Sequence, residues 1–173
     1  MTDAEDSHIC TIGSATDLAG NAACRLDWGP VQALLTPKVT LNTARTLMAA
    51  AAHAETDIAL LDWCRKTLKA DHNTAGHILL DVRAERPAPD IKTALRIASV
   101  AGAKTGLPYV HIARGSMKGE LSPDEARQMA THWTEAATAA QIDVRLRYTL
   151  DGHPLLAPAD VDQIFAQLRG LVR

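Results

Sequence analysis

Acidic, basic and imidazole side chains gather near the ends of two apolar segments that are typical of buried strands. Asp81 and Arg83 follow the apolar run 78–80, while His111 belongs to the segment 107–113 and Arg114 follows it directly. A histidine held beside a carboxylate and a guanidinium can serve as a general acid or base. Open sheets collect ligands at strand ends, so these four residues define one enzyme hypothesis.

Asp81 also belongs to a second set of chemically useful residues. Together with Asp90 and Lys92 it has the composition of the metal-binding acids and the lysine of restriction-enzyme-type nucleases. Asp90, however, follows Pro89, and we expect it in the first turn of a helix. There a carboxylate is stabilised by free backbone N–H groups and by the helix dipole. We therefore favour a helix start over a nuclease site.

Residues that could bind a metal are scattered along the chain. His72 and His77 flank a short stretch without a third donor, and the three cysteines form no CxxC pair. Metal sites more often use histidines at i, i+4 on a helix or further donors nearby. The chain also has no GxSxG, GxxxxGK[ST] or GxGxxG motif. We therefore predict neither a metal nor a cofactor.

The segment 113–122, ARGSMKGELS, combines basic residues and glycines before a predicted helix start. Arg114, Ser116 and Lys118 are its polar candidates for holding an anion. Backbone N–H groups in such a position can bind a phosphate. An ordinary surface loop is the alternative interpretation.

More basic residues lie in the segment 143–150, DVRLRYTL. Its alternation of polar and apolar residues predicts a half-buried strand with Arg145 and Arg147 on one face. With Arg83, these residues could contact a phosphate backbone without reading bases. The near-neutral net charge of -2 favours pairing with carboxylates of the protein instead. Nucleic acid is thus an alternative partner that we do not favour.

The composition limits the class of protein. A length of 173 residues suits one globular domain, and an aromatic content of 3% argues against a base-stacking module. No apolar run approaches the roughly 18 residues of a membrane span. The odd number of cysteines and the acidic N-terminus predict a reducing, cytoplasmic location.

The hydrophobic pattern predicts an α+β fold with a single mixed sheet covered by helices. We expect an N-terminal hairpin, two helices (or one long, bent helix) and then three strand–helix units with parallel strands; a three-layer α/β sandwich is the alternative. Ser122, Pro123 and Glu125 form a capping box. The predicted strands are 8–13, 22–28, 78–82, 107–113, 143–150 and 153–156, and the predicted helices begin at Asn42, Thr56, Pro89, Ser122 and Pro158.

No repeat or linker is evident in the sequence, so we expect residues 1–7 to be disordered and residues 8–173 to form one domain. Alanine-rich helix stripes at 44–51 and 126–140 suit close packing in the core or between subunits. We predict a small cytoplasmic binding or regulatory module that acts through protein–protein interaction, as a homodimer and without catalytic machinery. The enzyme and the phosphate-backbone binder are the alternatives.

Overall fold

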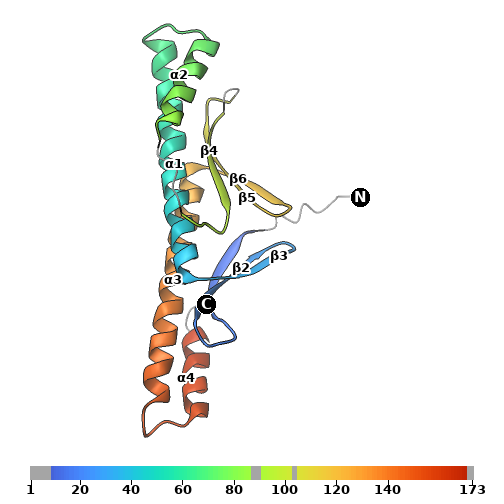
Figure 1. Ribbon diagram of the computed structural model, residues 1–173, viewed down its shortest axis with the longest axis vertical. Coiled ribbons are helices and arrows are strands. Elements are labelled where there is room, and N and C mark those ends of the chain that lie inside the picture. Colours follow the sequence, from blue (N-terminus) through green and yellow to red (C-terminus); the bar gives the residue numbers. More distant parts are fainter. Residues whose placement is uncertain (1–8, 87–90, 103–104, 171–173) are drawn as a thin grey trace.

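The protein has an α+β fold built from four helices and two small antiparallel sheets. The computed structural model describes residues 9–86, 91–102 and 105–170, so the predicted disorder of residues 1–7 lies outside the described residues. Figure 1 shows both sheets on the same side of two long helices. The elements are β1 (Thr11–Thr16), β2 (Ala22–Trp28), β3 (Val31–Leu35), α1 (Pro37–Lys66), α2 (His72–Ala84), β4 (Arg96–Ala101), β5 (Pro108–Arg114), β6 (Met117–Leu121), α3 (Pro123–Asp151) and α4 (Pro158–Gly170).

The chain contains the same unit twice, which we call the first half (β1 to α2) and the second half (β4 to α4). Each half is a three-stranded meander followed by a long and a short helix. Four elements of the second half begin 86 residues after their counterparts, at 108 against 22, 117 against 31, 123 against 37 and 158 against 72. The expectation of no internal repeat was therefore wrong. Few positions are identical between the halves, and this hides the repeat in the sequence.

The two halves exchange their long helices. α1 packs chiefly on β4 and β5 of the second sheet, while α3 packs chiefly on β1 and β2 of the first sheet. The two helices also pack closely on each other, with α2 and α4 at opposite ends of the pair (Figure 1). Each half thus covers the apolar face of the other half's sheet, and most of the core belongs to both halves.

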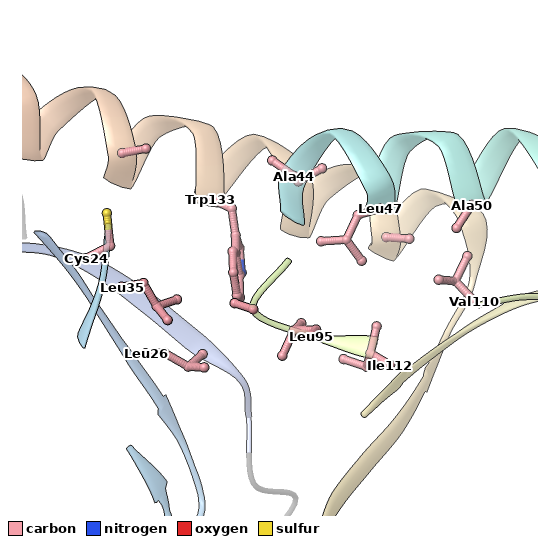
Figure 2. Close-up of a cluster of buried hydrophobic side chains, with 14 of the residues drawn as sticks. Cys24, Leu26, Leu35, Ala44, Leu47, Ala50, Leu95, Val110, Ile112 and Trp133 are labelled. Atoms are coloured by element: carbon pink, nitrogen blue, oxygen red, sulfur yellow. The ribbon is translucent and has the colours of Figure 1, made fainter. Parts of the chain in front are cut away.

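Small side chains line the contact between α1 and α3. Four alanines of α1 have alanine counterparts 86 residues later, and all eight are buried: Ala44, Ala50, Ala51 and Ala54, with Ala130, Ala136, Ala137 and Ala140. Small residues allow two helix backbones to approach closely. Figure 2 shows Trp133 pointing from α3 towards the sheets, with Leu35 on one side and Leu95 on the other. The alanine stripes therefore serve packing within the chain.

The long helices begin with the same cap chemistry. Thr36 caps α1, and its Oγ1 accepts a hydrogen bond from the backbone N–H of Val39; proline follows at the first helical position. Ser122 caps α3 in the same way, and the predicted capping box with Glu125 is confirmed. The predicted cap at Asn42 was wrong, because Asn42 lies inside α1. The region 37–66 is one continuous helix.

The single mixed sheet was also wrong, and so was the three-layer alternative, although the α+β class is confirmed. The structure has the strand orders β1-β2-β3 and β4-β5-β6, all antiparallel, with the helices on one side. The N-terminal hairpin, the strand 107–113 and the helix at Pro158 match β1–β2, β5 and α4. Gly29 and Pro30 end β2 as expected, but they form a tight turn after which the chain returns as β3. The sequence analysis did not predict this third strand.

On either side of residue 90, the predicted and the observed secondary structure are exchanged: a predicted strand is a helix, and a predicted helix contains a strand. The predicted strand 78–82 belongs to α2, which Asp71 caps by accepting from the N–H of Thr74. Leu79 packs on α1, whereas Leu80 is exposed, so the apolar run crosses a helix face. The predicted helix beginning at Pro89 was wrong as well. Pro89 lies outside the described residues, and 96–101 is strand β4.

The third misassigned segment is 143–150, which is the C-terminal part of α3. Its alternation suggested a strand, but the apolar residue Tyr148 is exposed at 83%. The predicted edge strand at 153–156 is a turn between α3 and α4. Among the described helices, none combines the length and the apolar character needed to span a bilayer.

Candidate functional site

A cleft of about 970 Å³ lies between the two sheets, and we call it the β1–β6 cleft. β1 and the residues before it, Ile9 and Cys10, form one wall, while all five residues of β6 form the other. Helix α3 forms the floor through residues spaced by three or four positions, which share one helix face. These floor residues are Glu125, Gln128, Met129, His132 and Trp133.

Both walls of the cleft are free strand edges. β1 and β6 are the outer strands of their sheets, and among the described residues neither pairs with a further strand. On an outer strand, alternate backbone N–H and C=O groups point away from the sheet and are available to another chain. The cleft therefore presents two backbone edges above a floor that carries both polar and apolar side chains.

The second half shows how the architecture holds a segment that leads into the first strand of a sheet. The segment 92–95 runs into β4 as Ile9 and Cys10 run into β1. Asn42 donates from Nδ2 to the carbonyl of Lys92 at 3.3 Å, and the hydroxyl of Thr43 accepts from the N–H of Ala94 at 2.8 Å. Arg114 donates to the carbonyl of Ala94. Leu95 is 2% exposed.

The residues that hold this segment have counterparts in the β1–β6 cleft. Gln128 and Met129 stand 86 positions after Asn42 and Thr43, and Trp28 stands 86 positions before Arg114. All three line the cleft. Within the part of the chain that the structure describes, Gln128 makes no side-chain hydrogen bond. Its amide thus occupies the position from which Asn42 holds a backbone carbonyl.

Two further groups define the chemistry of the cleft. The backbone N–H of Ser122 and then its hydroxyl donate to Glu125 and hold the pKa of this carboxyl below its usual value. Burial raises the pKa of the Cys10 thiol to about 12, against the opposing effect of Arg114. A protonated thiol is a poor nucleophile. The cleft is therefore better suited to binding than to covalent chemistry.

Trp133 closes the base of the cleft. The residue is fully buried, and its indole Nε1–H has no hydrogen-bond partner among the described residues. A buried donor without an acceptor costs about 1–3 kcal/mol. Its counterpart 86 positions earlier is Leu47, which is also fully buried. The first sheet is thus packed by a larger and partly polar side chain.

The residues of the enzyme hypothesis do not form one site. Asp81 is exposed on α2. On β5, His111 points away from the helices and Arg114 points towards them, because successive residues of a strand face opposite sides. His111 Nε2 lies 2.6 Å from Glu120 Oε1. The acid–base set of Asp81, Arg83, His111 and Arg114 is therefore not assembled.

Arg83 belongs to a buried ion cluster at the α1–α2 end of the molecule. It donates from Nε and Nη2 to Asp57 Oδ2 at 2.9 and 2.6 Å, and Arg86 donates to the other oxygen. Asp57 is fully buried. Arg83 also reaches the carbonyl of Ser99 on β4 at 3.5 Å. The cluster ties both α1 and α2 to the second sheet.

The expected basic strip is dispersed. Arg145 is exposed on α3, and Arg147, two positions on, points to another face because successive helical residues are about 100° apart. Arg147 pairs with Asp162 of α4 at 2.9 Å and lies over the ring of Phe165. Arg83, Arg145 and Arg147 therefore do not share a surface, and internal pairing applies to two of the three.

The predicted anion loop is the tight turn between β5 and β6. Arg114 opposes Met117 across a turn of two residues, Gly115 and Ser116. Gly115 has a φ of +57°, a conformation that favours glycine. Arg114 points towards α1 and Lys118 points to the opposite face. Arg114, Ser116 and Lys118 thus do not converge on one anion.

Among the described residues, no group of three or more histidine, cysteine or acidic side chains could hold a metal ion. Comparisons of the chain with models of protein families, with curated proteins and with solved structures find no match.

Sequence reasoning missed the cleft because one wall comes from β1, which lies far along the chain from β6 and α3, the other wall and the floor. One signal was present. Thr36-Pro37 and Ser122-Pro123 stand 86 residues apart and are followed by alanines at matching positions. Alignment at this offset would have paired the halves and drawn attention to Gln128 opposite Asn42.

Proposed function

We propose that the protein is a binding module that receives an extended segment of a partner protein in the β1–β6 cleft. This keeps the class of function expected from the sequence, a module acting through protein–protein interaction, and gives it a location. The supporting observations are the two free strand edges at the cleft and the segment 92–95, whose backbone is held by side chains of α1 at positions that match the α3 floor of the cleft.

The internal segment indicates what kind of ligand the architecture accommodates. It is a short stretch of chain, bent at Ala94 and Leu95, that buries both of these side chains and satisfies its backbone groups with side chains of α1 and β5. In the β1–β6 cleft, Gln128 takes the place of Asn42 on the helix floor. A partner carbonyl is its natural acceptor.

The partner segment is short and mainly apolar. β6 contributes five residues, which span roughly 17 Å in a strand, so the cleft accommodates about five extended residues. Alternate side chains of such a segment face the α3 floor, where Met129 and Trp133 offer apolar contacts, and its backbone pairs with the edge of β6, as in β-strand addition. Lys118 and Glu120 on β6 and Glu125 on the floor give no single sign of charge.

The test is selection of peptides from a library of random 12-residue sequences, with the purified full-length chain as bait. Gln128→Trp places a large side chain in the cleft from an exposed helix position. The matched control, Gln141→Trp, changes an exposed glutamine of the same helix outside the cleft. We expect selected peptides to bind the parent and Gln141→Trp alike and to lose at least tenfold in affinity for Gln128→Trp, because the substitution occupies their site.

Two outcomes would contradict this function. Peptides that bind both variants equally would place recognition elsewhere, and failure to select any peptide would remove the support for a segment-binding cleft. A third outcome concerns residues 2–8. If peptides bind only a chain shortened by these residues, the occupant is the chain's own N-terminal segment and not a partner.

Homodimerisation and a cytoplasmic location stay predictions. The alanine stripes that suggested subunit contacts pack against each other within the chain. Sedimentation of the purified protein gives the oligomeric state directly.

A further inference from the structure

The face of the second sheet that points away from the helices carries unbalanced positive charge; we call it the outer face. Strand pairing sets six of its residues in two rows across the strands: Arg96, Ala113 and Lys118 in one, and Ala98, His111 and Glu120 in the next. All six line a hollow of about 550 Å³. Five of the six are exposed, and Ala113 is half-buried.

The hollow exists because small residues lie between long ones. Arg96 and Lys118 stand on the two outer strands with Ala113 between them on β5. Two strand spacings separate their backbones by roughly 10 Å. Both side chains are long enough to meet above the methyl group of Ala113. The row therefore presents two cations that can converge on one small ion.

Neither cation has a counter-ion in the described part of the chain. No carboxylate lies within ion-pair distance of Arg96 or Lys118. The one acid of the outer face, Glu120, is engaged by His111 at 2.6 Å. Two like charges above one alanine repel, and a bound anion would offset that repulsion.

The first sheet has the same rows and is neutral there. Thr11, Asp27 and Gln32 form the row that corresponds to Arg96, Ala113 and Lys118. Asp27 pairs with Arg25 at 2.9 Å. Where the first half has an acid flanked by two uncharged side chains, the second half has an alanine flanked by two cations. The positive charge is therefore a property of this sheet alone and not of the shared architecture.

We propose that the outer face of the second sheet binds the phosphate group of a small phosphate monoester between Arg96 and Lys118. A phosphate of charge near −2 matches the two cations, and the planar guanidinium can hold two of its oxygens. His111 and Glu120 bound the hollow in the next row. The rest of the ligand lies over Ala98 and Ala113, whose small side chains leave room.

The test is a titration of the full-length protein with inorganic phosphate and with phenyl phosphate. Binding is detected by changes in the backbone amide NMR signals. Titration is done at a fixed ionic strength of about 0.15 M, so that general screening is constant. We expect saturable shifts at Arg96, Ala113 and Lys118. Arg96→Gln and Lys118→Gln should each weaken binding about tenfold, since each removes one charge-assisted contact. Arg25→Gln, on the equivalent face of the first sheet, should leave it unchanged.

Three results would overturn the proposal: no saturable shift at these residues, an equal response to chloride at the same ionic strength, or equal weakening by Arg25→Gln. Duplex DNA that binds this face more tightly than phenyl phosphate and with a steep salt dependence would also overturn it, by assigning the cations to a nucleic acid. Arg96 lies outside the β1–β6 cleft, so Arg96→Gln tests phosphate binding without testing peptide binding.

Discussion

Replacement of Asp57 by asparagine tests the ion cluster that joins α1 and α2 to the second sheet. The carboxylate is fully buried and accepts from Arg83 at one oxygen and from Arg86 at the other. Asparagine keeps the shape of the side chain but replaces one acceptor oxygen by an NH2 group. A donor then faces a guanidinium, and neither arginine keeps a full negative charge as its partner.

The magnitude follows from how far the two arginines remain buried. Removal of one member of a fully buried ion pair costs about 3–5 kcal/mol, because the remaining charge stays desolvated. Here the side chains of Arg83 and Arg86 are 31% and 20% exposed, so water partly solvates the orphaned guanidiniums. We therefore expect Asp57→Asn to lower the free energy of unfolding by about 2–4 kcal/mol.

Urea unfolding followed by circular dichroism measures this loss. With a slope of about 2 kcal/mol per molar urea, the midpoint should fall by roughly 1–2 M. Asp143 provides the matched control, since it stands 86 positions later and its one described contact is the hydroxyl of Ser14 at 3.5 Å. Asp143→Asn should cost less than about 1 kcal/mol. Equal midpoints for the two variants would refute the assignment of the cluster as a main stabilising contact.

Two further predictions concern the helix starts and the exchanged halves. Ser122→Ala should cost about 1 kcal/mol and Thr36→Ala less, because only the Ser122 hydroxyl also donates a hydrogen bond to Glu125; equal losses in thermal unfolding would contradict the role of that bond. Fragments 1–86 and 91–173, each lacking the partner helix that covers its sheet, should show no cooperative unfolding as separate monomers and should regain it as a 1:1 complex when mixed. Cooperative unfolding of either fragment as a monomer would show that the exchange is not needed for folding.

Local chemistry was predictable where a signal is complete within a few residues. Ser122, Pro123 and Glu125 specify a helix start by hydrogen bonds between near neighbours, and the alternation in 22–28 specifies a strand with one covered face. Both elements formed as expected. Pro158 at the start of α4 belongs to the same class, because its missing N–H is not needed at a first helical position.

Prediction failed where packing decided between helix and strand. The apolar run 78–80 and the alternating segment 143–150 each fit a strand by pattern, yet both extend helices whose ends are only partly covered. Because 143–150 was predicted to be a strand, Arg145 and Arg147 were expected on one face; in a helix, residues two positions apart point in different directions. The candidate site could not be predicted for a related reason. The cleft between β1, β6 and α3 exists because α3 covers the first sheet, and the sequence pattern does not show which helix covers which sheet.

The repeat gives a physical criterion for distinguishing structural from functional residues in this chain. Positions that pack the shared architecture keep their character across the 86-residue offset, as the buried alanines of α1 and α3 do. Positions outside the core have no such constraint, and there the halves differ in charge. The outer face of the first sheet is neutral in the row where that of the second sheet carries Arg96 and Lys118. Because both halves have the same backbone plan, folding alone does not require this difference. The difference in charge on the outer faces is therefore the feature that the proposed phosphate site depends on, and the Arg96→Gln and Arg25→Gln variants compare the two faces directly.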